Sequence, residues 1–327
     1  SGCAKTEDAA AGSVEQEEQE VQIGLSFESF VIERWMRERD VFVSAAKELG
    51  AEVNVQNANG DVEEQISQIE YFIKKQVDVI VVVAGDCEAL SDVMIKAREA
   101  GIKTVSYDRL IMNAGCDLYI SFDNTEVGRL MAENMLENIP DGGDIFLIQG
   151  PLTDNNVSLI REGIDETLAG SNLNVVYEAN CPGWIAENAY TYTKEGLKLD
   201  RNVKGIICGN DDLASQAFRA LSEERLAGKV CVTGQDGDLA ACQRIVEETQ
   251  EMTAFKSVEQ EASLAAKCAV LLGLGEEIEE VQDTAYDGTY NVPYLELQPI
   301  AVTKENMDEV IIKGGFHAKE DVYLNVN

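Results

Sequence analysis

The segment from Val62 to Ala84, VEEQISQIEYFIKKQVDVIVVVA, contains the two patterns that decide the fold. Its first part places apolar side chains at the spacing of one helix face, at Ile66, Ile69, Phe72 and Ile73. Its last part, Val77–Ala84, is a short run of the Val and Ile residues that buried parallel strands require. The segment therefore predicts an amphipathic helix followed by a buried strand.

The same alternation continues along most of the chain. A second helix pattern covers Arg34–Leu49, and Asn124 and either Asp154 or Asn155 are candidate helix caps. Ten runs qualify as strands: Gln22–Phe27, Glu52–Asn57, Val77–Ala84, Lys103–Tyr107, Leu118–Phe122, Asp144–Gln149, Asn174–Glu178, Val203–Cys208, Lys229–Thr233 and Glu251–Phe255. Strand–helix alternation predicts an α/β fold with doubly wound parallel sheets. Because ten strands exceed a typical sheet, we expect two such lobes.

A late extended segment, Tyr290–Thr303, indicates that the chain passes between the lobes more than once. We expect crossings near residues 122–124, 256–258 and 294–298, which form a three-segment hinge. The predicted parts are a tether (1–20), an N-terminal lobe (21–122 plus 257–294) and a C-terminal lobe (123–256 plus 295–327). A ligand is then expected between the lobes, outside the carboxyl ends of the strands.

Composition excludes several classes of function. The formal net charge of −34 would repel a phosphate backbone, which argues against binding to DNA or RNA. The single histidine, His317, excludes most histidine-based catalysis and multi-histidine metal sites, and we interpret it as structural or exposed. No stretch reaches 18 apolar residues, so no membrane-spanning helix is predicted. We expect no metal and no cofactor.

The eight cysteines contain no CxxC pair. We interpret Cys208, Cys231 and Cys268 as buried apolar residues, and leave open a pairing of Cys87 with Cys116. Cys3 differs, because the opening Ser-Gly-Cys-Ala resembles the end of a bacterial lipoprotein signal that is cleaved before the cysteine. The alternative is an incidental thiol. Lipidation at Cys3, followed by the acidic stretch to Glu20, predicts a flexible tether and an extracytoplasmic protein anchored by lipid.

The residues that follow the predicted strands are rich in charged, amide and indole side chains. We select ten of them as candidate ligand contacts: Arg34, Trp35, Asp108, Arg109, Asp154, Asn156, Trp184, Asn210, Asp236 and Lys256. This set suits a polyol such as a sugar, whose hydroxyl groups both donate and accept hydrogen bonds. The two tryptophans provide flat apolar surfaces for its C–H faces.

Each of these residues also has a structural interpretation. Either tryptophan could be a packing residue, Asp108-Arg109 a surface ion pair, Asn210 a helix cap, Asp236 a turn residue and Lys256 a solvated lysine. Glu33 is better interpreted as a solvated helix residue. The prediction of a ligand site rests on the joint placement of the ten residues at one end of two lobes.

Several segments carry a resemblance to a known family: Glu33-Arg34-Trp35 with Arg39-Asp40, Gln56–Gly60, Gln65–Glu70, Tyr107-Asp108-Arg109, Tyr119–Asn124, Asp154-Asn155-Asn156, Gly183-Trp184, Asn210-Asp211, Gly234–Asp236, Phe255-Lys256 and Gly315–His317. Over Val21 to Val322 the chain resembles the type I periplasmic-binding-protein family, in particular its D-xylose-binding group from ABC sugar importers. The resemblance implies that eight polar residues of the set hydrogen-bond the sugar and that Trp35 and Trp184 flank it. The chain departs from the family pattern at Phe27-Glu28-Ser29 and at Cys181-Pro182.

By that resemblance, the chain is a monomeric solute receptor, not an enzyme, that delivers a monosaccharide, first of all D-xylose, to the permease of an ABC importer. An alternative is a sugar sensor, for xylose or glucose, that presents its ligand to a membrane kinase or chemoreceptor. A transcription regulator would need a basic helix-turn-helix, whereas the first twenty residues are acidic. An enzyme is disfavoured because the motifs GxSxG and GxxxxGK[ST] are absent from the sequence.

Overall fold

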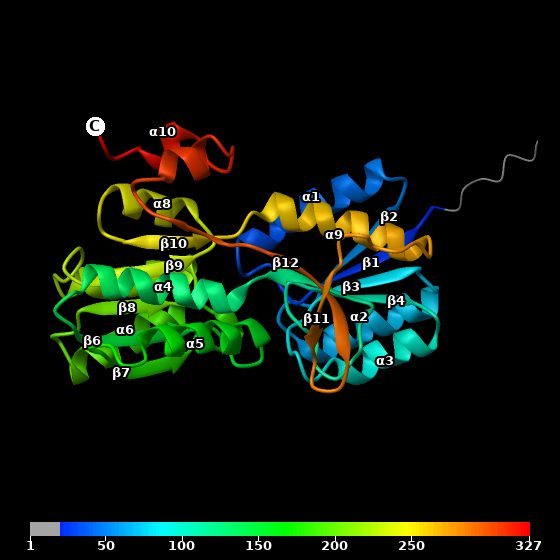
Figure 1. Cartoon of the computed structure of the whole chain (residues 1–327), viewed down its shortest axis with the longest axis horizontal. Helices are drawn as coiled ribbons and strands as arrows, with labels where there is room; N and C mark the ends of the chain where they lie inside the picture. The colour runs from blue at the N-terminus through cyan, green and yellow to red at the C-terminus, as the bar shows by residue number, and fades with distance from the viewer. Residues whose placement is uncertain (1–19) are drawn as a thin grey trace, which may run out of the picture.

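The computed structural model describes residues 20–327 and divides them into two sheets (Figure 1). The expected lipidation site Cys3, and the tether up to residue 19, lie outside the described residues. The sheets have the strand orders β11-β12-β5-β4-β3-β1-β2 and β13-β10-β9-β8-β6-β7. Both contain the same doubly wound core, in which the first strand lies between the second and the third along the chain. The predicted α/β class with two parallel-sheet lobes is confirmed.

The first lobe is built on the parallel strands of residues 22–122. Its strands and helices are β1 (Gln22–Phe27), α1 (Arg34–Glu48), β2 (Glu52–Asn57), α2 (Val62–Lys75), β3 (Val79–Val83), α3 (Ser91–Glu99), β4 (Lys103–Tyr107), β5 (Leu118–Phe122), α9 (Val258–Gly273), β11 (Asp283–Tyr286) and β12 (Asn291–Leu297). Helices α1 and α9 cover one face of the sheet, and α2 and α3 cover the other. Strand β3 is buried along its whole length, which explains its unbroken apolar sequence.

The second lobe repeats this arrangement. It contains α4 (Asn124–Asn138), β6 (Gly143–Gln149), α5 (Asn155–Leu168), β7 (Leu173–Asn180), a 3₁₀ turn (Pro182–Trp184), α6 (Glu187–Leu199), β8 (Gly205–Cys208), α7 (Asp211–Glu223), β9 (Cys231–Gln235), α8 (Leu239–Val246), β10 (Met252–Phe255), β13 (Ile300–Val302), a π-helical turn (Asp308–Ile312) and α10 (Lys319–Val322). Helices α4 and α5 pack on one face of the sheet, and α6 and α7 on the other. The cap of α4 is Asp123 rather than the expected Asn124, and the cap of α5 is Asp154.

The two sheets are connected at three places along the chain: after β5, after β10 and after β12. Strand β12 pairs with β5 as far as Leu297, so residues 295–297 belong to the first sheet, beyond the change of lobe expected at 294/295. The antiparallel hairpin of β11 with β12 was not anticipated as two strands. The connections contact one another: Asp123 N donates to Leu297 O at 2.8 Å, and Lys256 Nζ to Asn124 Oδ1 at 2.6 Å.

The seven cysteines in the described part of the chain are all free thiols. The pairing considered for Cys87 and Cys116 is therefore not made. Cys208 and Cys268 are buried as expected, whereas Cys231 is only partly buried. Among residues 20–327 we find no helix of the length and apolarity needed to cross a membrane, and no group of three metal-ligating side chains.

Candidate ligand-binding site

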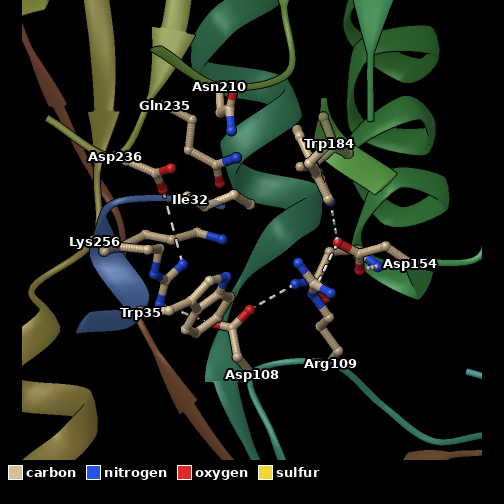
Figure 2. A pocket seen from close by; sticks show the side chains of 13 residues that line it. Ile32, Trp35, Asp108, Arg109, Asp154, Trp184, Asn210, Gln235, Asp236 and Lys256 are labelled. Atoms are coloured by element: carbon tan, nitrogen blue, oxygen red, sulfur yellow. Dashed lines mark hydrogen bonds and ion pairs between the residues drawn. The ribbon is translucent and has the colours of Figure 1, made fainter. Parts of the chain in front are cut away.

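A small cavity lies between the lobes at the carboxyl ends of both sets of parallel strands (Figure 2). The empty space between its walls is about 300 Å³ when its opening to solvent is included. The residues that line it are Ile32, Arg34, Trp35, Asp108, Arg109, Asp154, Asn156, Ile160, Trp184, Asn210, Gln235, Asp236 and Lys256. All ten residues selected from the sequence are therefore brought together around one space.

The first lobe contributes the loop after β1 and the loop after β4. Arg34 and Trp35 begin α1, and both are buried. Trp35 lines the cavity and also packs against Phe27 in the core. Asp108 and Arg109 follow β4 directly, and Asp108 has the left-handed backbone conformation, with φ of 68°. That conformation is rare for a residue with a side chain, and it turns the chain sharply at the end of the strand.

The second lobe contributes the loops after β6, β7, β8, β9 and β10. Asp154 caps α5 through a bond from Asn156 N, and its Oδ2 accepts from Trp184 Nε1 at 3.0 Å. Trp184 lies flat against Gly150, where a Cβ atom would come within 2.3 Å of the indole ring, so only glycine fits there. Asn210 caps α7 with its Oδ1, while its Nδ2 faces the cavity wall without a partner.

Three contacts between side chains join the two lobes across the cavity. Asn156 Nδ2 donates to Asp108 Oδ1 at 2.9 Å, and Arg109 Nε lies 3.1 Å from Asp154 Oδ2. Arg34 Nη1 lies 3.8 Å from Asp236 Oδ1. Because these contacts need both lobes at once, the structure is a closed arrangement.

Buried charges of both signs fill the site. Burial alone would raise the pKa of Asp108, but Arg34 and Lys256 hold it well below the usual range of a carboxyl group. Burial lowers the pKa of Lys256 and raises that of Asp236, in each case against the effect of oppositely charged neighbours. Asp108 thus stays ionised and accepts hydrogen bonds, while Arg34 donates to it.

Six cavity residues each have a buried polar side-chain atom without a hydrogen-bond partner in the described structure. These atoms are Arg34 Nε, Trp35 Nε1, Arg109 Nε, Asn156 Oδ1, Asn210 Nδ2 and Gln235 Oε1. Arg109 Nε faces Asp154 as an ion pair whose geometry is not that of a hydrogen bond. Buried polar atoms are normally paired, so a cluster of unpaired donors and acceptors around one space indicates a polar ligand. A ligand with several hydroxyl groups suits both kinds of atom, since a hydroxyl donates and accepts.

Sequence reasoning missed three residues of the cavity wall. Gln235 precedes Asp236 and was part of the strand-end motif, but it was not selected. Ile32 and Ile160 are apolar and carry no signal that separates them from core residues. Glu33 is exposed, as interpreted, and His317 Nε2 lies 2.7 Å from Gly237 O.

The unusual residues after β1 and β7 have identifiable partners. Glu28 does not line the cavity; its Oε1 lies 3.1 Å from Arg109 Nη1, so it anchors an arginine that does. Cys181 is buried, and its backbone N donates to Gln149 O at 2.7 Å. Glu28 thus supports a cavity residue from behind.

Comparison with known proteins agrees with this geometry. The family model described as "Periplasmic binding protein domain" matches residues 23–277. The D-xylose-binding periplasmic protein of Haemophilus influenzae is 43% identical over 93% of this chain and 92% of its own, and that of Escherichia coli is 40% identical over 93% of each. The crystal structure of an ABC transporter solute-binding protein from Clostridium phytofermentans with bound β-D-glucose is 26% identical, with a TM-score of 0.85 over 92% of this chain and 99% of that one.

The family match covers most of the chain, the relatives match over nearly all of it, and the closed cavity lies where the doubly wound strands end. This chain therefore belongs to the periplasmic binding protein family, a family of solute-binding proteins.

Proposed function

We propose that this protein is an extracytoplasmic receptor that captures a monosaccharide, first of all D-xylose, between its two lobes. The observation that carries the proposal is the set of six unpaired polar atoms around one small cavity between the lobes. A sugar ring presents hydroxyl groups in several directions and can pair with these atoms from both lobes at once. The two D-xylose-binding relatives, each at least 40% identical, support the choice of sugar.

The ten residues selected from the sequence would share the recognition. Asp108, Asp154 and Asp236 would accept hydrogen bonds from sugar hydroxyls. Arg34, Arg109, Lys256, Asn156 and Asn210 would supply the donors, and the indoles of Trp35 and Trp184 would cover the C–H faces. Because these groups come from both lobes, the ligand would stabilise the closed arrangement.

The closed form would then dock on the membrane permease of an ABC importer, and lipid at Cys3 would keep the receptor at the membrane. The solute-binding protein of Clostridium phytofermentans, which has the same fold, supports the transporter role. No catalytic step and no cofactor enter this proposal.

Titration calorimetry of the full chain with D-xylose, D-glucose, L-arabinose and D-ribose tests the function. We expect a one-to-one isotherm for D-xylose and much weaker binding of D-glucose, because the extra CH₂OH group must fit a small closed cavity. The bound sugar should be recovered unchanged after long incubation. If none of the four sugars bound, the sugar assignment would be refuted, and sustained turnover of a sugar would refute the receptor role.

A further inference from the structure

Two buried glutamates behind the cavity have no part in the function described so far. Glu38 lies one turn after Arg34 on α1, and Glu261 lies on α9, which packs beside α1 in the first lobe (Figure 1). Neither side chain is exposed, and neither lines the cavity. Both contact Arg34, which does line it. The pair therefore connects the core of the first lobe with a group that faces the ligand.

The hydrogen bonds at Nη2 of Arg34 exceed the number of hydrogens on that atom. Its Nη2 lies 2.7 Å from Glu38 Oε1, 2.7 Å from Glu261 Oε2 and 2.9 Å from Asp108 Oδ2. An Nη atom carries two hydrogens, so it cannot serve three carboxylates at once. Glu38 and Glu261 also lie within hydrogen-bonding reach of each other, and Glu261 Oε1 has no donor in the described structure. One proton on this pair supplies the missing hydrogen bond.

The balance of charge around the pair points the same way. The groups that face it are Arg34 from α1, Tyr107 and Asp108 from β4 and its loop, Tyr119 from β5, and Lys256 from the hinge. Two cations, Arg34 and Lys256, thus meet three carboxyl groups, those of Glu38, Glu261 and Asp108, in a buried space. Full ionisation would leave uncompensated buried negative charge, which is costly.

The proton belongs on the pair rather than on Asp108. Burial raises the pKa of Glu38 to about 7 and holds that of Glu261 well above its usual range. The pKa of Asp108 is lowered by the neighbouring cations although burial opposes this.

We propose that Glu38 and Glu261 are positioning residues that share one proton, and that this proton keeps the Arg34 guanidinium directed at the bound sugar. The inference rests on the proposed sugar-binding function. With the proton in place, Arg34 remains shared with Asp108 at the cavity wall. Without it, two full negative charges compete for Nη2 behind the cavity. Closure around a sugar removes water and favours the less charged pair, so binding of sugar and of this proton are linked.

The linkage is measured on the full chain by calorimetry with D-xylose between pH 6 and pH 8.5, in buffers of different ionisation enthalpy. We expect the Kd to rise roughly tenfold over this range, with proton uptake on binding near neutral pH. Gln in Glu261→Gln cannot titrate, and its amide N–H donates to Glu38 in place of the shared proton, so Glu38 stays ionised and the ratio of the Kd values at pH 8.5 and pH 6 should approach one. The matched control is Glu259→Gln, an exposed position on the same helix, which should keep the parental profile.

The possible outcomes separate the inference from the function. A flat parental profile without proton uptake overturns the proton pair but leaves the receptor intact, whereas no D-xylose binding at any pH refutes the receptor itself. Asp211 is a second buried carboxyl group whose pKa burial raises to about 7, in the other lobe. If Asp211→Asn flattens the profile and Glu261→Gln does not, the inference is wrong. If Glu261→Gln does not fold, Glu38→Gln takes its place in the same test. Asp211→Asn should then keep the proton uptake of the parent, and loss of that uptake would overturn the inference.

Discussion

Three residues that line the cavity have positive φ angles, a backbone conformation that residues with a side chain usually avoid. The φ angles are 68° for Asp108, 58° for Trp184 and 101° for Asp236. Such residues cost about 1–3 kcal/mol each and persist only where the surroundings hold them. Asp108 is held on both sides, because its N donates to Ile120 O at 2.7 Å and its O accepts from Ser121 Oγ at 2.6 Å. Three of the eight such residues in the described part of the chain thus lie at the site that we assign to the ligand.

We expect Asp108→Asn to fold and to lose affinity for the sugar. Asn tolerates the left-handed conformation, so the backbone remains unchanged. The substitution removes the negative charge that faces Arg34 and Lys256, and leaves these buried cations less compensated. The expected loss is about 2–5 kcal/mol of binding free energy, measured by calorimetry with D-xylose.

Asp40→Asn is the matched control for this substitution. Asp40 is an exposed residue of α1 whose Oδ1 pairs only with its neighbour Arg39, and exposed pairs contribute little. Equal affinities of Asp108→Asn and the parent would show that Asp108 does not contact the ligand.

At the scale of elements, a buried carboxylate links the turn of the late hairpin of β11 and β12 to the loop before β5. Asp287 lies in the turn between the two strands and accepts from four backbone N–H groups, those of Ala114, Gly115, Thr289 and Tyr290, at 2.7–3.0 Å. Its side chain is fully buried. It therefore fixes the loop before β5 to the strand that precedes one of the hinge connections.

Asp287→Asn should destabilise the protein by about 1–3 kcal/mol at pH 7, since several buried N–H groups lose a charged acceptor. Burial opposes ionisation, yet the four donors hold the pKa of Asp287 below its ordinary value of 3.8. The contribution is therefore fully present above about pH 4 and is lost as the pH falls through the lowered pKa of the folded state.

Urea denaturation at pH 7 and pH 3 measures this effect. The difference between the parent and Asp287→Asn should narrow at the lower pH. Asp283→Asn is the control, because exposed Asp283 accepts only from the adjacent Thr284 N. A difference that is the same at both pH values would mean that the charge of Asp287 contributes nothing.

At the scale of the whole molecule, contacts outside the cavity also hold the lobes together. Arg37 of α1 donates from Nη1 to Phe316 O at 3.2 Å, and its guanidinium lies 4.3 Å from the centre of the Phe316 ring. Phe316 packs in turn on Phe255, at the end of β10. On another part of the interface, Cys87 N donates to Thr153 O at 2.9 Å. These contacts stabilise closure without touching the ligand.

Arg37→Ala should therefore weaken the binding of all sugars by the same factor, roughly threefold to thirtyfold, because a cation–π contact and a hydrogen bond donated by a charged group are lost. The effect should lie in faster release rather than slower association, and stopped-flow fluorescence with D-xylose and D-glucose measures both rates. Arg39→Ala is the control, since Arg39 contacts only Asp40 and Phe30 of its own lobe. A change in the preference between the two sugars would contradict the assignment.

The apolar periods of the sequence were sufficient to predict the parallel strands of residues 22–255 and the fold class. The expected runs Gln22–Phe27, Glu52–Asn57, Lys103–Tyr107 and Leu118–Phe122 coincide with β1, β2, β4 and β5. The rule that ligands lie at the carboxyl ends of parallel strands then selected ten of the thirteen cavity residues. The two apolar residues Ile32 and Ile160 were missed because their chemistry is that of any core position.

The sequence by itself thus determined two doubly wound lobes and the polar groups at their strand ends, because both follow from local periodicity and from the order of strands and helices. Only the tertiary structure decided which of those groups meet. Glu261 is 227 residues from Arg34 along the chain, and it reaches Arg34 because α9 returns to the first lobe after the second is complete. The register between lobes, the proton shared behind Arg34 and the Arg37–Phe316 contact depend on such long-range packing, which leaves no periodic signal in the chain.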